Sequence, residues 1–193
     1  MSTIVVSEFV TVDGVMEDPG GAEGFRHGGW AFRFDRGADG DRFKLEELQA
    51  AGALLLGRRT YEGFAAVWPS VTDEQGFAEK MNSMPKYVVS STLEEASWAN
   101  STILRGDLAE AVERVQRESD GDVLVAGSAT LVQGLAELDL VDRYRLMVFP
   151  IVLGTGKRLF RETADAAALR LVEARPAGAV VTMVLERDRG ADG

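Results

Sequence analysis

Residues 54–64 read LLLGRRTYEGF, a run of leucines that ends in a glycine followed by two arginines. Gly57 lets the backbone come close to a ligand, and Thr60 can cap the helix predicted for the following residues. The guanidinium groups of Arg58 and Arg59 are planar forks that match phosphate oxygens. Because the first amides of a helix also favour an anion, this strand-to-helix junction predicts a phosphate site. A solvated helix start is the alternative interpretation of the same residues.

Strand and helix patterns alternate through the chain. Strands are expected at residues 4–12, 53–56, 87–89, 103–104, 123–126, 144–150, 169–174 and 180–185. Helices are expected at residues 41–51, 60–67, 73–84 and 107–119, and after residues 127–130 with Leu131, Leu135 and Leu138 inward. The alternation predicts parallel βαβ units with helices on both faces of the sheet. We therefore expect one three-layer α/β/α domain over residues 1–193, with a mixed, mostly parallel sheet, a C-terminal antiparallel hairpin and a frayed tail at residues 188–193.

A second strand-to-helix junction, Gly127-Ser128-Ala129-Thr130, consists of small residues and opens another helix. Between the two junctions, Ser90-Ser91-Thr92 ends a third strand with hydroxyl donors. Ligands of open α/β sheets bind outside the carboxyl ends of the strands. The three features together predict a dinucleotide cradle, with one site for a ribose phosphate and one for a pyrophosphate. The pattern is not the Rossmann fingerprint, and a tight turn with a helix cap is the plainer interpretation of the second junction.

The composition limits the class of partner. The 193 residues carry a net charge of −10 and a sequence pI of about 4.7, which argues against nucleic acid or an anionic membrane. There is no cysteine, which excludes disulfides and thiolate metal sites, and no motif has metal-ligand spacing. No segment approaches the roughly 18–20 apolar residues of a membrane span, and the N-terminus lacks a signal-peptide pattern. We expect a soluble cytoplasmic protein with a small-molecule substrate.

The ordered set of motifs resembles the dihydrofolate reductase-like superfamily. It is most similar to the branch that includes the C-terminal reductase domain of the bifunctional riboflavin-biosynthesis enzyme. The resemblance covers roughly residues 4–186, and it rests on SEFVTVDGVMEDPGG, LLLGRRTYEGF, WP, MPKYVVSSTL, VAGSATLVQGLAELDLVDRYRLMVFPIVLGTGKRLF and the terminal hairpin. It implies an NADPH-dependent oxidoreductase that forms a homodimer, and we expect the C-terminal strands at the interface.

The resemblance also implies which residues bind NADPH. They are Gly57, Arg58, Arg59 and Thr60 at the 2′-phosphate side, Ser90 and Ser91 at the adenine ribose, Gly127, Ser128, Ala129 and Thr130 at the pyrophosphate, and Val6, Ser7 and Gly14 near the nicotinamide. At least one of the two arginines would then hold the 2′-phosphate. Ser128 stands where dihydrofolate reductases often carry a second glycine, and it still offers its amide and adds a hydroxyl.

The sequence departs from the family pattern in its acid chemistry. A folate reductase uses one buried carboxylate on its first helix to hold the pterin and support protonation, and burial would raise the pKa of such a group. The corresponding region carries Asp35, Asp39, Asp41, Glu46 and Glu47, and none of them stands out. Asp41 is the candidate catalytic residue. The plainer interpretations are a helix cap for Asp41 and solvated positions for Glu46 and Glu47.

The favoured hypothesis is an NADPH-dependent reductase. It would transfer hydride to a small heterocyclic (pteridine- or pyrimidine-like) or ribosylamino substrate, and Arg26, Arg33 or Lys157 could contact a substrate phosphate. One alternative is an NADPH-binding protein without turnover, such as a sensor. A structural homodimer that binds no nucleotide is another. The reductase and the sensor both predict NADPH binding, but only the reductase predicts oxidation of NADPH when a substrate is supplied.

Overall fold

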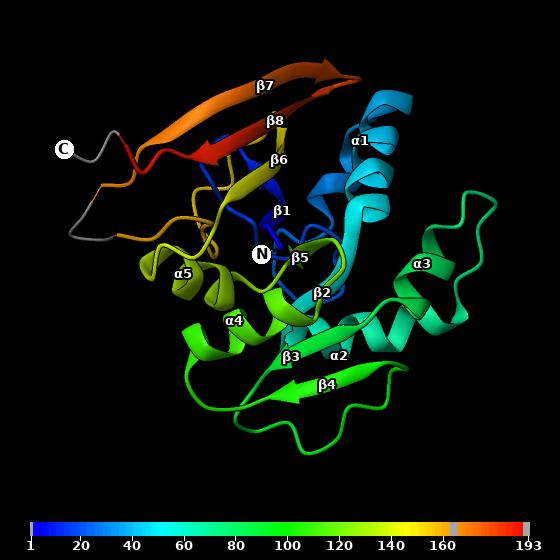
Figure 1. Ribbon diagram of the computed structural model, residues 1–193. Helices are drawn as coiled ribbons and strands as arrows, with labels where there is room; N and C mark the ends of the chain where they lie inside the picture. The colour runs from blue at the N-terminus through cyan, green and yellow to red at the C-terminus, as the bar shows by residue number, and fades with distance from the viewer. Residues whose placement is uncertain (1, 163–165, 191–193) are drawn as a thin grey trace.

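The computed structural model describes residues 2–162 and 166–190, and one eight-stranded sheet runs through this part of the chain (Figure 1). The strands are β1 (Ile4–Thr11), β2 (Ala51–Gly57), β3 (Lys86–Val89), β4 (Ser101–Leu104), β5 (Asp122–Ala126), β6 (Arg143–Phe149), β7 (Leu169–Ala177) and β8 (Val180–Arg187). Their order across the sheet is β4-β3-β2-β5-β1-β6-β8-β7. Strands β1 to β6 are parallel, and β8 is antiparallel to both β6 and β7. The predicted mixed, mostly parallel sheet with a C-terminal antiparallel hairpin is confirmed.

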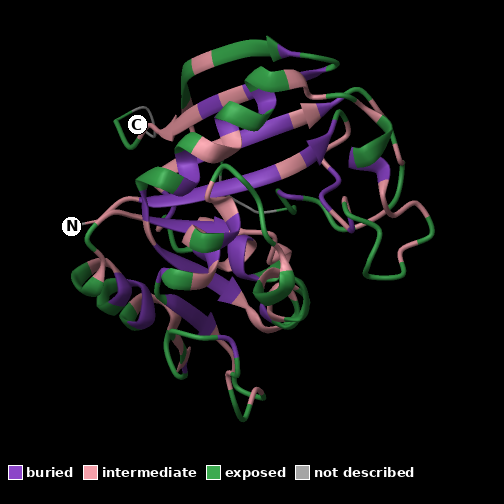
Figure 2. Ribbon diagram, turned by 90° about the vertical axis from the view of Figure 1, so that its right-hand side faces the viewer, coloured by how far each residue is buried: buried purple, intermediate pink, exposed green. Residues whose placement is uncertain are grey.

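Helices cover both faces of the sheet. They are α1 (Gly37–Ala50), α2 (Arg58–Val67), α3 (Phe77–Ser83), α4 (Leu108–Glu118) and α5 (Ala129–Glu137), with short 3₁₀ turns η1 (Trp30–Arg33) and η2 (Trp68–Ser70). Leu48 of α1 packs with Val5 on one face, and Val112 of α4 packs with Val6 on the other. Figure 2 shows the buried strands lying between the partly exposed helices. The predicted three layers are confirmed, while a single domain over residues 1–193 stays a prediction.

Strand β1 lies between β5 and β6 and divides its side chains between the two faces. Successive residues of a strand point to opposite faces of the sheet. Val5 and Ser7 accordingly face α1, whereas Val6 and Val10 lie in the core beneath α4 and α5. Glu8 has the same parity as Val6 and therefore faces α5. This alternation decides which polar groups of β1 share a surface.

The predicted first residues of α1 and α3 are each wrong by four positions. Helix α1 begins at Gly37, so Asp41 lies inside the helix and does not cap it. Helix α3 spans only Phe77–Ser83 rather than residues 73–84. The carboxylate of Asp73 instead accepts hydrogen bonds from the backbone N–H groups of Gln75, Phe77 and Ala78. These bonds favour a turn before the helix, because an Asp side chain competes with helical hydrogen bonding.

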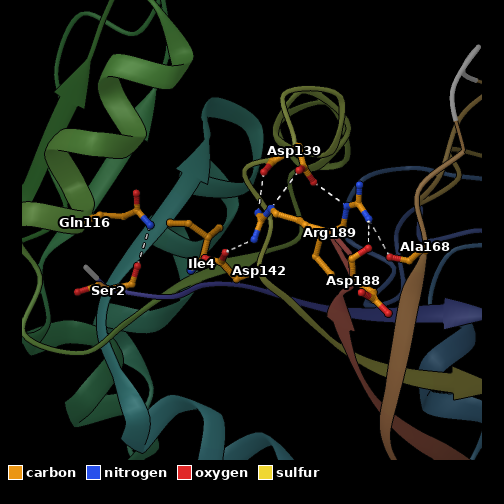
Figure 3. A network of polar contacts seen from close by, with 9 residues as sticks. Ser2, Ile4, Gln116, Asp139, Asp142, Ala168, Asp188 and Arg189 are labelled. Atoms are coloured by element: carbon orange, nitrogen blue, oxygen red, sulfur yellow. Dashed lines mark hydrogen bonds and ion pairs between the residues drawn. The ribbon is translucent and has the colours of Figure 1, made fainter. Parts of the chain in front are cut away.

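The predictions for α5 and the C-terminal tail are correct only in part. Leu131 and Leu135 are buried, but Leu138 is 50% exposed because α5 ends at Glu137. Residues 191–193 of the predicted tail lie outside the described residues. Arg189, by contrast, is held by side-chain hydrogen bonds (Figure 3). Its guanidinium donates to the carboxylate of Asp139 at 3.0 Å and to that of Asp142 at 3.3 Å. Residues 188–190 are therefore not a frayed tail.

Candidate functional site

The predicted site residues lie along one edge of the sheet. Strands β3, β2, β5 and β1 are parallel neighbours, so their carboxyl ends meet at the same edge. Strand β2 runs into α2 at Gly57, and β5 runs through Gly127 and Ser128 into α5. Two helix N-termini and the turn after β3 are thereby placed side by side. The sheet topology thus brings together segments that are far apart in the sequence.

Ser128 joins the two strand-to-helix junctions. Its Oγ accepts a hydrogen bond from the backbone N–H of Gly57 at 2.9 Å. Its own backbone N–H donates to Oγ1 of Thr60 at 2.9 Å. A Cβ atom at Gly127 would lie 2.9 Å from Cγ2 of Thr60, and the positive φ of +61° also favours glycine there. The two junctions therefore form one cross-linked unit.

This cross-link changes the roles that were predicted for two residues. Thr60 is not a helix cap, because α2 already begins at Arg58 and the Thr60 hydroxyl accepts from Ser128 instead. The Ser128 amide is likewise occupied within the protein. At the start of α5, the backbone N–H groups of Ala129 and Thr130 belong to the first helical turn and need partners from outside the helix. These two amides are suited to an anion.

The two arginines of the first junction differ in their availability. Nη1 of Arg58 donates to both carboxylate oxygens of Glu62, at 3.1 and 3.0 Å, and the Arg58 side chain is 40% exposed. Arg59 is exposed, and its side chain makes no hydrogen bond or ion pair within the described part of the chain. Arg59 is therefore the better placed of the two to bind an anion from solvent.

A cavity of about 380 Å³ opens beside the turn after β3. It is lined by Val89, Ser90, Ser91, Thr92, Leu104, Arg105 and Gly106. Arg105 was not predicted as a site residue; its guanidinium donates to the carbonyl oxygens of Ser91 at 2.8 Å and Leu93 at 2.6 Å. The sequence signal for Arg105 was its position directly after the short strand β4, at the carboxyl edge of the sheet. Serine hydroxyls and a guanidinium suit a ribose or a phosphate.

The three residues predicted near a nicotinamide have different environments. The side chain of Val6 is fully buried in the core, so only its backbone could approach a ligand. Ser7 is buried, and its hydroxyl points towards α1. Gly14 has a φ of +79° in the turn after β1, and its carbonyl oxygen accepts from the N–H of Leu159 at 2.9 Å. The contacts of these residues with a cofactor stay predictions.

A charged network missed by the sequence analysis lies between β1, β6 and α1. The Ser7 hydroxyl donates to Oε1 of Glu47 at 2.6 Å, and Nζ of Lys44 donates to Oγ of Ser7 at 2.5 Å. Lys44 also forms an ion pair with Glu47. On the other side, Nε of Arg145 donates to Oε2 of Glu47 at 3.2 Å, and its guanidinium lies 3.9 Å from the ring centre of Phe43. The side chains of Lys44 and Arg145 are each 17% exposed.

The prediction that Glu47 is solvated is therefore wrong. Its side chain is 3% exposed, whereas that of Glu46 is 59% exposed. The available signal was helical spacing, because Glu47 follows Phe43 by four positions and so shares its inward face. A buried carboxylate is tolerated there because two cations and a hydroxyl satisfy its oxygens.

Asp41 lies away from this network. Its side chain is 53% exposed and pairs with Nε of Arg36 at 2.6 Å. It is thus not the carboxylate in an apolar pocket that the resemblance implies. The candidates for a substrate phosphate are also spread out: Nε of Arg26 donates to His27, Lys157 pairs with Glu17 at 3.9 Å, and Arg33 is exposed.

Glu8 is a second buried carboxyl group that the sequence analysis missed. The residue is 5% exposed, and its Oε1 has no hydrogen-bond partner among the described residues. Burial raises the pKa of Glu8 well above its usual value of 4.5, although the charge of Lys44 and the backbone N–H of Gly127 act in the opposite direction. The protonated form of the carboxyl group is therefore favoured.

A larger cavity of about 660 Å³ lies at the opposite, amino edge of the sheet. It is lined by Ser2, Thr3, Ala50, Gln116, Arg117, Ser119, Asp120, Gly121 and Asp122. Because ligands of open α/β sheets bind at the carboxyl edge, this cavity is not the candidate site. Within residues 2–162 and 166–190, no group of three or more His, Asp or Glu side chains is placed to hold a metal ion. None of the described helices has the length and hydropathy of a membrane span.

The fold and its carboxyl edge define an open-sheet α/β protein with two helix N-termini side by side at one edge. The chain belongs to the RibD C-terminal domain family, whose model matches residues 2–183. The resemblance to this branch of the dihydrofolate reductase-like superfamily is thereby confirmed, and the chain falls in a riboflavin-pathway reductase family.

Individual proteins are similar to this chain along most of its length. Uncharacterized protein YyaP of Bacillus subtilis (strain 168) is 27% identical over 186 residues, which cover 94% of this chain and 93% of the relative. A putative riboflavin biosynthesis protein from Shewanella sp. PV-4 has a similar structure, with a TM-score of 0.77, 19% identity and coverage of 98% and 100% of the two chains. A diaminohydroxyphosphoribosylaminopyrimidine deaminase/5-amino-6-(5-phosphoribosylamino)uracil reductase from Thermotoga maritima has a TM-score of 0.63 and 14% identity, and the match covers 97% of this chain and 57% of that one. At these identities the two structures show the shared fold alone.

Proposed function

We propose that the protein is an NADPH-dependent reductase of a small heterocyclic (pteridine- or pyrimidine-like) or ribosylamino substrate. The observation that carries the proposal is the cross-linked pair of helix N-termini at the carboxyl edge, where Ser128 connects α5 to Gly57 and Thr60 of α2. The order of features along this edge matches an extended dinucleotide. The cavity by Ser90 suits the adenosine, the two helix starts suit the phosphates, and the end of β1 follows next.

The chain's own groups supply the binding. Arg59 lies at the start of α2 and would hold the 2′-phosphate, with Arg105 at the cavity wall beside the ribose. The amides of Ala129 and Thr130 would hold the pyrophosphate. Because Ser128 fixes the two helix starts to each other, these donors are already oriented before a ligand arrives. Preorganised donors lose less entropy on binding.

The chemistry of the reduction is divided between the cofactor and the chain. A bound reduced nicotinamide supplies the hydride. On the α1 face, Lys44 holds a proton at Nζ, 2.5 Å from the Ser7 hydroxyl. Glu47 accepts a hydrogen bond from that hydroxyl and forms an ion pair with Lys44. This network can orient a substrate and provide a proton after hydride transfer. Lys44 therefore replaces Asp41 as the candidate proton donor.

Calorimetric titration of the purified protein with NADPH and NADH tests the proposal. We expect NADPH to bind at least tenfold more tightly than NADH, which corresponds to about 1.4 kcal/mol. A screen of pyrimidine, pteridine and ribosylamino compounds would then follow the loss of NADPH absorbance. Equal binding of the two cofactors would overturn the phosphate assignment, and failure of both to bind would overturn the reductase.

An NADPH-binding protein without turnover is the second candidate. The exposed position of Asp41 favours it, since this predicted catalytic residue lacks the buried environment that the resemblance implies. This protein would bind NADPH with the same preference over NADH, but it would oxidise NADPH with none of the screened substrates. Activity that depends on Lys44 would exclude it.

The proposed assembly is a homodimer that covers the C-terminal hairpin. Strand β7 lies at the edge of the sheet, and Leu171 and Val172 on it are 56% and 48% exposed. Natural proteins rarely leave an apolar edge strand uncovered. Sedimentation equilibrium should give twice the mass of the chain, and Leu171→Glu should shift the equilibrium towards the monomer. A monomeric wild-type protein at micromolar concentration would contradict the dimer.

A further inference from the structure

Glu8 lies where β1 and β5 separate. The last residue pair between these strands is Ser7 with Ala126, whereas β1 stays paired with β6 as far as Thr11. Strand β5 then leaves the sheet through Gly127, which turns into α5. Glu8 is the first residue of β1 beyond the shared part, and its side chain is on the α5 face. Its electrostatic neighbours include Lys44, Glu47 and the backbone N–H of Gly127.

One oxygen of the Glu8 carboxyl group has no partner among the described residues, although the backbone N–H of Gly127 acts on the group. Oε1 is inaccessible to solvent and makes no hydrogen bond within the described residues. Lys44, whose charge acts on Glu8, instead forms its bonds to Ser7 and Glu47 on the other face of the sheet. Buried polar groups are nearly always hydrogen-bonded. Oε1 of Glu8 lies at the edge where ligands of open α/β sheets bind. Its missing hydrogen-bond partner therefore points to an atom of the ligand.

The order of the strands indicates which part of a dinucleotide would reach Glu8. The hydroxyl-lined cavity is beside β3 and β4, the anion-binding helix starts follow β2 and β5, and β1 is next in the sheet. A dinucleotide whose adenosine is at the cavity and whose pyrophosphate is at α5 therefore places its nicotinamide at the separation of β5 and β1. The reactive ring of NADPH carries a primary carboxamide, which has both donor and acceptor atoms.

We propose that Glu8 is a cofactor-positioning residue that recognises the nicotinamide carboxamide as a neutral carboxylic acid. The acid O–H donates to the carboxamide oxygen, and the acid carbonyl oxygen accepts from the carboxamide N–H. One donor and one acceptor on each side make the pair complementary. The proposal rests on the proposed NADPH binding. It explains why this buried position carries a carboxyl group rather than an apolar side chain.

Three ligands and three proteins test this pairing. The ligands are NADPH, the reduced 3-acetylpyridine analogue of NADPH, which lacks the amide N–H, and adenosine 2′,5′-bisphosphate, which lacks the nicotinamide. The proteins are the wild type, Glu8→Gln and Glu8→Met, and binding is measured by calorimetry. We expect Glu8→Met to weaken NADPH about tenfold, while Glu8→Gln, which keeps a donor and an acceptor, retains most of the affinity. The bisphosphate should bind all three proteins equally.

The wild type alone provides a further test that does not depend on the folding of a variant. It should bind NADPH more tightly than the acetylpyridine analogue, and this preference should grow as pH rises through the ionisation of Glu8. The analogue then loses its only hydrogen bond to Glu8, whereas the carboxylate still accepts from the carboxamide N–H. Equal binding of NADPH by the wild type and Glu8→Met, or an equal loss for NADPH and the bisphosphate, would overturn the role of Glu8. If the bisphosphate and NADPH both fail to bind the wild type, the proposed function itself is wrong, and the inference fails with it.

Discussion

The backbone N–H of Ser128 donates a hydrogen bond to Oγ1 of Thr60, 2.9 Å away, and this bond connects the start of α5 to the first turn of α2. In return, the Ser128 hydroxyl accepts from the N–H of Gly57 at 2.9 Å. Two helix ends that follow different strands therefore cannot move independently. The side chains that make the connection are thus structural, and under the proposed function the amides of Ala129 and Thr130 and the guanidinium of Arg59 would bind the phosphates.

Replacing Thr60 with valine should break this connection with little change of shape. The Ser128 amide would lose its acceptor, which we expect to lower the free energy of unfolding by about 1–2 kcal/mol. The affinity for NADPH should fall as well, because the two phosphate sites would lose their fixed separation. Urea unfolding and calorimetry measure the two effects. Thr60→Ser keeps the acceptor and is the matched control; the same loss in both variants would refute the role of the hydroxyl.

Arg59 should carry more of the preference for NADPH than Arg58 does. Arg58 is paired with Glu62, whereas Arg59 is exposed and its side chain bonds to none of the residues that the structure describes. Arg59→Ala should weaken NADPH by about tenfold or more and leave NADH nearly unchanged, because only NADPH carries the 2′-phosphate. Arg58→Ala should have the smaller effect on the ratio of the two affinities. A larger effect of Arg58→Ala would reverse the assignment.

The alternation of strand and helix patterns was enough to predict the layers and the edge at which the candidate site lies. Apolar strands such as residues 53–56 and 123–126 are unmistakable, and the glycines that follow them mark the turns into α2 and α5. These are local signals. They predicted Gly57, Arg59 and Gly127 as neighbours at one edge because the topology of parallel sheets is strongly constrained.

The polar network under α1 could not be predicted in this way. Glu47 and Arg145 are 98 positions apart in the chain, and their contact depends on the pairing of β6 with β1, which sets Ser7 opposite Arg145. No short sequence motif predicts the register between β1 and β6. The burial of Glu8 could not be predicted from the sequence either. It depends on the point at which β5 leaves the sheet beside β1.

Glu47→Gln should destabilise the protein strongly. The substitution removes the charge that Lys44 and Arg145 share, so two partly buried cations would repel each other without a counter-ion. Breaking a buried ion pair from one side costs about 3 kcal/mol or more. Glu46→Gln on the exposed face of the same helix is the control, with an expected change within about 0.5 kcal/mol. Denaturant titrations that gave equal values for the two variants would show that the network contributes little to stability.

Glu8→Gln should change the pH dependence of stability. Because burial raises the pKa of Glu8 above 4.5, the folded state holds its proton after the unfolded state has lost it. The wild type should therefore lose stability relative to Glu8→Gln as pH rises from about 4.5 through the folded pKa, and the difference should be constant above that pH. Unfolding of both proteins between pH 4 and pH 8 measures it. A difference that does not vary with pH would contradict a raised pKa.

Lys86 should give a pH dependence of opposite sign in the alkaline range. The residue is 1% exposed, its ammonium donates to the carbonyl oxygens of Asn82 at 2.9 Å and Met84 at 2.7 Å, and burial lowers its pKa from 10.5 to about 8. Between these two pH values the unfolded chain binds a proton that the folded protein has released, so stability rises with pH. The wild type should gain about 1–2 kcal/mol relative to Lys86→Met between pH 7 and pH 10. Tyr144, whose pKa burial raises to about 12, acts in the other direction but equally in both proteins. The difference in unfolding free energy between the two proteins therefore reports on Lys86 alone. A difference that stays constant across this pH range would show that burial does not lower the pKa of Lys86.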